Sequence, residues 1–329
     1  VLEAEKSTPI LRRCRGIITK CGTKEENMGQ FHGVVPAIIS PKNEDGTLNE
    51  EAFRATMEFN IQAGVHGFWV AGGTGESVLL DDEENQRIAE IAADQNAGRT
   101  QVIMHVGANT TARAEKLAAH AAQAGVEAVC AVPPFFYQGD DDGVVEYYRA
   151  VGAAADRPLF IYNLPGCTGL DVSPALMQRL VDEVPQTTGL KHSSPVFANL
   201  IEFVGMGLDA FIGSGKLMLP AMTVGAVGSV DGPLCAAPEL WMAIWNAYQA
   251  GDLAAAKQAQ ERASAFHRTV AQFGYFGSIL AVVSQRIGME CGDPRRPLRP
   301  VRPDERETLL AQVEALGLGD FFGFLRDYE

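Results

Sequence analysis

The sequence has few of the features that mark disulfide-rich, metal-binding or membrane proteins. Its 329 residues include six cysteines, none in a Cys-x-x-Cys pair, which is too sparse for a disulfide scaffold and favours a reduced, cytoplasmic protein. The six histidines lack the spacing of metal ligands, so we expect no metal site. The apolar runs are far shorter than the ~18–20 residues of a membrane-spanning helix.

Positive charge is also scarce. The chain has 27 Lys and Arg against 41 Asp and Glu, a formal net charge of −14. A protein this acidic repels phosphate backbones and anionic lipid surfaces, so we expect neither a nucleic-acid nor a membrane partner. The hydrophobic share of 47% and the charged share of 21% are ordinary for a globular protein and argue against disorder.

Residues 1–31 differ in composition from the rest of the chain. They hold a basic patch at Arg12, Arg13 and Arg15, but no sustained periodicity and no apolar stretch typical of a secretory signal. Four glutamates argue against a transit peptide, because transit peptides are poor in acidic residues. We expect an ill-ordered extension or a remnant of cloning, with Met28 as a candidate natural start.

From residue 32 onward, short apolar segments bounded by Gly or Pro alternate with helical patterns. The segments are nearly all apolar, as expected of strands buried on both faces. Strands are predicted at residues 34–39, 67–70, 101–106, 128–132, 158–162, 187–191, 210–213 and 225–230. Helices are predicted at residues 49–63, 81–93 and 110–124, from Ser173 onward, and in shorter patterns at 199–206 and 217–224.

Eight such units in ~200 residues predict an α/β fold, a (β/α)8 TIM barrel, over residues 32–235. A doubly wound sheet is the alternative, but it usually has fewer strands and a Gly-rich fingerprint after the first strand, which residues 39–42 do not supply. Beyond residue 235 only helical patterns remain, at 238–250, 254–270, 278–287 and 303–315. We therefore predict a C-terminal helical region over residues 236–329.

Functional residues of such a barrel lie in the loops after the strands. The loop after the second strand, residues 72–77, has three glycines whose N–H groups can form an anion nest, and Thr74 adds a hydroxyl group; a plain tight turn is the alternative. Tyr162 ends the fifth strand, where it is either functional or a residue at the rim of the core. Lys191, one of eight lysines, ends the sixth strand.

Lys191 is the only lysine inside a predicted strand. Burying an unpaired ammonium group is costly, and desolvation favours the neutral amine, which is a Schiff-base nucleophile. The alternative is an exposed lysine at a strand end. With Gly73-Thr74 as a carboxylate cradle and Tyr162 as a proton shuttle, Lys191 completes the set that a Schiff-base enzyme acting on a 2-oxo acid needs.

These motifs resemble the dihydrodipicolinate synthase / N-acetylneuraminate lyase family of class I aldolases over about residues 32–315. The matching pieces are Gly72-Gly73-Thr74-Gly75-Glu76-Ser77, Tyr162-Asn163-Leu164-Pro165 with Thr168-Gly169, and Gly189-Leu190-Lys191. The resemblance implies a homotetramer that uses no cofactor beyond its own covalent imine. It also implies that Lys191 forms the imine, that Tyr162 relays protons, and that Gly73-Thr74 binds the pyruvoyl carboxylate.

The sequence departs from the family pattern at several positions. The synthase usually has two adjacent hydroxyl residues in the first loop, and here Gly73 replaces the first of them. An arginine that holds the second substrate's carboxylate is replaced by Cys167. A second tyrosine, donated across a subunit interface, aligns best with Phe136, which leaves Tyr137 as a candidate. The acidic pair with which the lyase holds a glycerol tail is absent from residues 213–216.

We therefore predict a lyase that cleaves a short 4-hydroxy-2-oxo acid to pyruvate and an aldehyde. Residues 213–228 are similar to 4-hydroxy-2-oxoglutarate aldolases, and the first loop is also similar to that of 5-dehydro-4-deoxyglucarate dehydratases. Synthase-type condensation and dehydration of a 2-keto-3-deoxy sugar acid, both on the same lysine, are the alternatives. A non-catalytic protein that binds a 2-oxo acid is the alternative from another class.

The substrate pocket is expected to extend past the cradle. The predicted substrate-binding residues are Gly73, Thr74, Tyr137, Cys167, Gly213, Ser214, Lys216 and Val230. Lys216 is the one cation among them and predicts a dicarboxylate such as 4-hydroxy-2-oxoglutarate, unless it begins the next helix and faces solvent. His192 should point away from the barrel interior because strand side chains alternate, and Glu76 should accept hydrogen bonds from buried backbone N–H groups of its own loop.

Overall fold

The computed structural model describes residues 30–137 and 139–318. Residues 1–29, which make up most of the predicted N-terminal extension, lie outside the described residues, as do residues 319–329 at the end of the predicted helical region. The division of the chain at residue 235 stays a prediction.

Eight parallel strands form the predicted barrel. They are β1 (Gly33–Val34), β2 (Gly67–Val70), β3 (Gln101–His105), β4 (Ala128–Ala131), β5 (Leu159–Asn163), β6 (Thr187–His192), β7 (Asp209–Ile212) and β8 (Gly228–Ser229). They pair in the order β1-β8-β7-β6-β5-β4-β3-β2. Backbone hydrogen bonds from the N–H of His66 to the oxygen of Val34 (2.9 Å) and from the N–H of Trp69 to the oxygen of Pro36 (2.9 Å) join β2 to the segment of β1 and close the sheet. The (β/α)8 fold is thereby confirmed.

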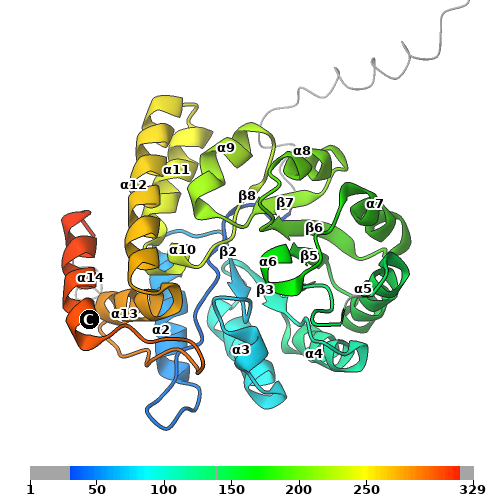
Figure 1. Ribbon diagram of the computed structural model, residues 1–329, viewed down its shortest axis with the longest axis horizontal. Coiled ribbons are helices and arrows are strands. Elements are labelled where there is room, and N and C mark those ends of the chain that lie inside the picture. Colours follow the sequence, from blue (N-terminus) through cyan, green and yellow to red (C-terminus); the bar gives the residue numbers. More distant parts are fainter. Residues whose placement is uncertain (1–29, 138, 319–329) are drawn as a thin grey trace, which may run out of the picture. The chain divides into compact units, whose positions relative to one another are not determined.

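Helices follow the strands and surround them (Figure 1). Between the strands lie α2 (Glu50–Gln62), α3 (Asp82–Asn96), α4 (Thr111–Ala124), α5 (Asp141–Ala155), α6 (Pro165–Thr168), α7 (Pro174–Glu183), α8 (Ala198–Gly205), α9 (Met218–Thr223) and the 3-10 turns η3 (Ser77–Leu79) and η4 (Gly215–Leu217). The predicted N-cap Asn49 accepts a hydrogen bond from the N–H of Ala52 at 3.0 Å. Helix α5 was not predicted, because Gly143 and Gly152 interrupt its pattern.

Among the described residues, five helices follow β8, and the last four of them lie within the predicted C-terminal helical region. They are α10 (Pro233–Ala236), α11 (Pro238–Gln249), α12 (Leu253–Gln272), α13 (Tyr275–Ile287) and α14 (Pro303–Ala315), and Figure 1 shows them gathered on one side of the barrel. Within the described ranges, no helix combines the length and the apolar character needed to cross a membrane.

The core has two layers, as expected for strands buried on both faces. The larger layer lies between the strands and the helices. The smaller one fills the barrel interior and consists of Phe31, Val35, Ala37, Trp69, Ile103, Ala128, Cys130, Val132, Phe160, Tyr162, Phe211 and Val230. The interior is therefore a packed core, and a catalytic side chain within it is held by its neighbours.

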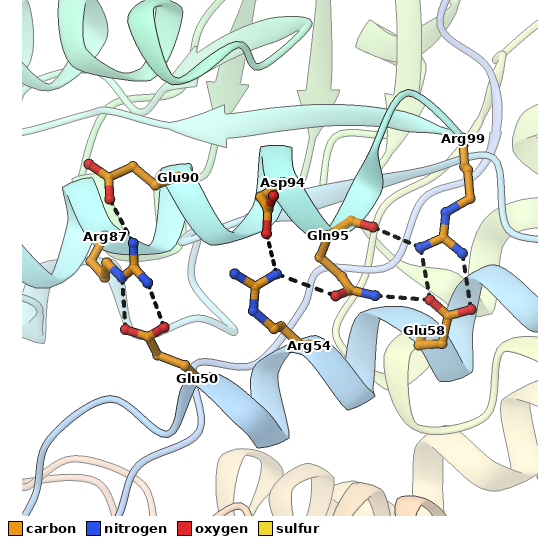
Figure 2. Close-up of polar contacts among 8 residues, drawn as sticks. All are labelled: Glu50, Arg54, Glu58, Arg87, Glu90, Asp94, Gln95 and Arg99. Atoms are coloured by element: carbon orange, nitrogen blue, oxygen red, sulfur yellow. Dashed lines mark hydrogen bonds and ion pairs between the residues drawn. The ribbon is translucent and has the colours of Figure 1, made fainter.

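Ion pairs join neighbouring helices α2 and α3 on the outside of the barrel (Figure 2). Arg87 pairs with Glu50 at 2.7 Å, and Arg54 pairs with Asp94 at 2.6 Å. Glu58 pairs at 2.8 Å with Arg99, in the turn that follows α3. These side chains are partly exposed, so each pair contributes only about 0–1 kcal/mol to stability.

Gly228 tests the tight pairing of β1 with β8. A Cβ atom on Gly228 would overlap the carbonyl oxygen of Gly33, so Gly228→Ala should lower the free energy of unfolding by about 1–3 kcal/mol or more. The control is Gly205→Ala in α8, where the added Cβ would meet no atom within 4 Å. Urea denaturation followed by circular dichroism should show a loss only for Gly228→Ala, and equal stability of the two variants would contradict this packing.

Candidate active site

Lys191 and Tyr162 lie side by side on neighbouring strands inside the barrel. The two residues are register partners of β6 and β5, and their exposed fractions are 4% and 5%. The Lys191 Nζ atom lies 4.4 Å from the ring centroid of Tyr162 and 5.3 Å from that of Trp69 on β2. Two aromatic faces therefore surround the amine, an arrangement that stabilises a positive charge on that nitrogen.

The glycine-rich loop after β2 approaches the Tyr162 hydroxyl group. A Cβ atom on Gly73 would lie 3.6 Å from that hydroxyl oxygen, so the backbone of the loop passes close to it. The turn is held by hydrogen bonds from the N–H of Glu76 to the oxygen of Gly73 (3.0 Å) and from the N–H of Ser77 to the oxygen of Gly72 (3.1 Å). Loop, phenol and amine are thus brought together from three strands, and Thr74 is buried within the same loop.

Glu76 connects this loop to the C-terminal helical region. Its carboxylate is buried and accepts a hydrogen bond from the backbone N–H of Arg295 at 2.6 Å. Burial raises the pKa of Glu76, and the Arg295 N–H and guanidinium partly oppose the rise. The Arg295 guanidinium also donates to the backbone oxygen of Ser40 (3.1 Å) and pairs with Glu84 (2.6 Å). Glu76 thus accepts a backbone N–H group, but the donor belongs to a segment 219 positions along the chain and not to its own loop as predicted.

A cavity of about 360 Å³ opens beside Tyr162, within the size range of small-molecule sites. It is lined by Gly73, Glu76, Ser77, Val78, Leu79, His105, Val132, Phe135, Tyr162, Leu164, Cys167, Thr168, Phe276, Pro297 and Leu298. Lys191 and Thr74 are not among the lining residues, but both adjoin them through Tyr162 and Gly73. The cavity is therefore a candidate binding site for a small molecule.

His105 at the end of β3 is a lining residue to which sequence reasoning assigned no role. It is 1% exposed, and its ring lies edge-on to Tyr162 with the centroids 6.2 Å apart. Its Nε2 atom accepts a hydrogen bond from the N–H of Val132 at 3.4 Å. Burial, and next the charge of Lys191, lower the pKa of His105 to about 4, so it is neutral near pH 7.

Asp231, just after β8, was also missed. Its carboxylate accepts hydrogen bonds at 2.8 Å from the N–H of Gly215, the N–H of Gly232 and the hydroxyl of Tyr275, and it lies 3.4 Å from His267 Nε2. Burial alone would raise the pKa of Asp231, but the hydrogen bond and charge of His267, with the other donors, lower it. A buried carboxylate thus joins the loops after β7 and β8 to α12 and α13.

This cluster lies next to the glycine-rich loop. The Thr74 hydroxyl oxygen and the Tyr275 hydroxyl oxygen each lie 2.6 Å from the point where a Cβ atom on Gly232 would be. No sequence motif signals the cluster, because Asp231 and Tyr275 are 44 positions apart.

The structure does not bring all predicted site residues to the cavity. Cys167 lines it, whereas Val230 is fully buried in the barrel interior and the partly buried Gly213 and Ser214 are not lining residues. Tyr137 is 81% exposed and does not line the cavity. His192 faces away from the interior as predicted, with its ring nitrogens near Asn163 Nδ2 (3.4 Å) and the backbone oxygen of Val196 (3.1 Å).

The prediction that Lys216 lines the substrate pocket is corrected, because Lys216 lies on a different surface. It is exposed on η4 and lines a separate groove with Lys257 and Arg268. The cause is the preceding residue, Gly215, whose N–H is held by Asp231 while its carbonyl oxygen accepts the indole N–H of Trp241 at 3.0 Å. This anchoring turns η4 toward α12 and leaves the predicted pocket without its cation.

Among residues 30–137 and 139–318, no three His, Cys, Asp or Glu side chains are grouped so that they could hold a metal ion.

Comparison with known proteins gives consistent matches along almost the whole described chain. The model of the dihydrodipicolinate synthetase family matches residues 30–316. A 4-hydroxy-tetrahydrodipicolinate synthase of Methanopyrus kandleri is 32% identical over 293 residues, which cover 88% of this chain and 97% of the relative. The structure of dihydrodipicolinate synthase from Aquifex aeolicus has a TM-score of 0.82 at 27% identity and covers 88% of this chain and 99% of that one. N-acetylneuraminate lyase of Proteus mirabilis has a TM-score of 0.82 at 26% identity, with coverages of 88% and 100%.

The lowered pKa of His105 predicts a pH-dependent stability. Between a folded-state pKa of about 4 and the ordinary value of 6.5, the unfolded chain binds the proton more tightly. His105 alone should therefore lower the free energy of unfolding by about 3 kcal/mol as the pH drops from about 6.5 to about 4. Denaturation at several pH values should show a smaller fall for His105→Asn than for wild type. His66, whose pKa is also lowered to about 4, is retained in both proteins, so equal falls would contradict the prediction.

Proposed function

Because this chain belongs to the dihydrodipicolinate synthetase family, whose members are lyases of the class I aldolase type, we propose that it cleaves a 4-hydroxy-2-oxo acid to pyruvate and an aldehyde through an imine on Lys191. The observation that carries the proposal is the buried Lys191 amine, which lies 4.4 Å from the ring centroid of Tyr162, whose hydroxyl group the glycine-rich loop approaches.

In the proposed reaction Lys191 is the nucleophile and Tyr162 transfers protons. The Lys191 nitrogen attacks the C2 ketone, and loss of water gives a protonated imine that acts as an electron sink. Tyr162 removes the proton from the C4 hydroxyl group, the C3–C4 bond breaks, and the aldehyde leaves an enamine behind. Tyr162 returns this proton to C3, and hydrolysis of the imine then releases pyruvate and restores the amine.

The surroundings of Lys191 suit this chemistry. The faces of Trp69 and Tyr162 stabilise the cationic imine. In this proposal the backbone of Gly73 and the hydroxyl group of Thr74 bind the pyruvoyl carboxylate. The buried indole N–H of Trp69 lies beside Gly72 and has no hydrogen-bond partner in the described part of the chain, so it supplies one more donor for that carboxylate.

Synthase-type condensation is the second candidate, because the relative from Methanopyrus kandleri carries that name. It would use the same imine with a different acceptor. Cys167, where the family pattern has an arginine, disfavours an acceptor with a carboxylate. A panel of 2-oxo acids scored for pyruvate release separates cleavage from condensation, and from dehydration on the same lysine.

The family resemblance also supports a cytoplasmic homotetramer as part of the proposal. Phe136 and Tyr137 are each 81% exposed, and the backbone of Phe136 has a φ of +74°, a strained conformation for a bulky residue. We propose that this aromatic pair enters the site of a neighbouring subunit, and that Tyr137 acts there.

Lys191→Ala should abolish both turnover and covalent trapping of pyruvate, because no other amine lies within the barrel interior among the described residues. Borohydride reduction in the presence of pyruvate, read by intact mass and peptide mapping, should place one reduced pyruvate unit per chain on Lys191. Lys257→Ala, on the separate surface groove, is the control and should keep both properties. Trapping or turnover at the wild-type level in Lys191→Ala would refute the mechanism.

Tyr162→Phe should lower kcat by about 10²–10⁴-fold, the usual contribution of a positioned acid–base group. The ring that packs on Lys191 is retained, so imine formation should persist in part. Steady-state kinetics together with the trapping assay separate the two effects. A rate within a few-fold of wild type would mean that another group moves the proton, with Tyr137 as the first candidate.

A further inference from the structure

The wall of the cavity beyond Tyr162 is apolar. Its apolar members come from the loops after β2, β4 and β5 and from the C-terminal helical region: Val78, Leu79, Val132, Phe135, Leu164, Phe276, Pro297 and Leu298. Several of them, including Phe135, Leu164 and Leu298, are partly exposed. When an apolar ligand covers apolar side chains and removes them from water, the free energy of the system falls, which favours binding.

The lining offers no cation to pair with a negative charge. It contains no lysine or arginine, and its ionisable members are Glu76, His105, Tyr162 and Cys167. The His105 ring is neutral near pH 7, because burial lowers its pKa to about 4. Lys216 lies on the separate groove. A substrate carboxylate at this end would therefore be desolvated without compensation.

Two polar side chains of the lining, Thr168 and Glu76, are hydrogen-bonded within the protein. The Thr168 hydroxyl group donates to the backbone oxygen of Leu164 at 3.0 Å and accepts the N–H of Leu170 at 3.3 Å. The Glu76 carboxylate accepts the N–H of Arg295. A polyol chain would find few free partners here, whereas an apolar chain needs none.

We propose that the aldehyde partner of this enzyme is uncharged and apolar, either aliphatic or aromatic. The substrate would be a 4-hydroxy-2-oxo acid with an apolar group beyond C4, in place of the dicarboxylate expected from Lys216. The inference rests on the proposed function. In the addition direction, C3 of the pyruvate enamine bonds to the aldehyde carbon, the aldehyde oxygen takes a proton from Tyr162, and water hydrolyses the imine to release the product.

The first test measures aldol addition of pyruvate to straight-chain aldehydes from acetaldehyde to hexanal, with glyoxylate and succinic semialdehyde as anionic comparators. Each added methylene should raise kcat/KM about fourfold until the cavity is filled, which corresponds to ~0.8 kcal/mol per buried methylene. Succinic semialdehyde should react more slowly than pentanal. A flat series, or a preference for the anionic aldehydes, would overturn the inference.

The second test adds a positive charge to the cavity wall. Cys167→Arg places a cation on an exposed residue that lines the cavity and should shift the preference toward succinic semialdehyde over pentanal by about 10- to 150-fold, or ~1.5–3 kcal/mol. Gly166→Arg is the matched control, because Gly166 precedes it in α6, has nothing within 4 Å of an added Cβ atom and does not line the cavity. Equal shifts in both variants would mean that the cavity does not bind the aldehyde.

Trapping with pyruvate and borohydride keeps the two levels of the proposal apart. If the adduct forms on Lys191 but apolar aldehydes are not preferred, the substrate class is refuted while the Schiff-base function stands. If no adduct forms, the function fails and the inference fails with it. An adduct together with the rising aldehyde series supports both.

Discussion

The amine of Lys191 must sit inside a packed apolar core without being buried as an uncompensated charge, and much of the site follows from this constraint. Aromatic faces from β2 and β5 surround it, which is possible only because the strands around it are in register and the sheet closes between β1 and β2. Gly189 makes part of that register possible, since a Cβ atom there would overlap the backbone oxygen of Asp209 on β7. The chemistry of one nitrogen thus depends on strand packing all around the barrel.

The barrel does not build the site alone. The Arg295 backbone N–H binds Glu76 of the glycine-rich loop, and the Tyr275 hydroxyl binds Asp231 after β8. Both contacts bring the C-terminal helical region onto the catalytic face, where Phe276 and Leu298 complete the cavity wall. This region therefore supplies part of the cavity lining as well as contacts that hold two loops of the barrel.

The surface groove and the cavity beside Tyr162 differ in positive charge. A chain with a net charge of −14 has three cations, Lys216, Lys257 and Arg268, in a surface groove and none in the lining of the cavity beside Tyr162. Under the function proposed above, the pyruvoyl end binds through backbone and hydroxyl groups, and the opposite end is selected by apolar contact.

The local sequence pattern was sufficient to predict the fold and the residues at the centre of the candidate site. Continuous apolar strands, capped helices and the order of the motifs predicted the barrel, and in a barrel the strand ends bring Tyr162, Lys191 and the glycine-rich loop to one face. Helix α5 was not predicted because Gly143 and Gly152 weaken its helical pattern, although tertiary packing stabilises the helix. His105, Asp231 and the apolar wall depend on contacts between residues far apart in the chain, and the direction of Lys216 depends on hydrogen bonds made by Gly215. Periodicity reports which face of an element is buried, but the neighbours that a side chain meets across the core are set by the packing of distant segments, and only the folded structure contains that information.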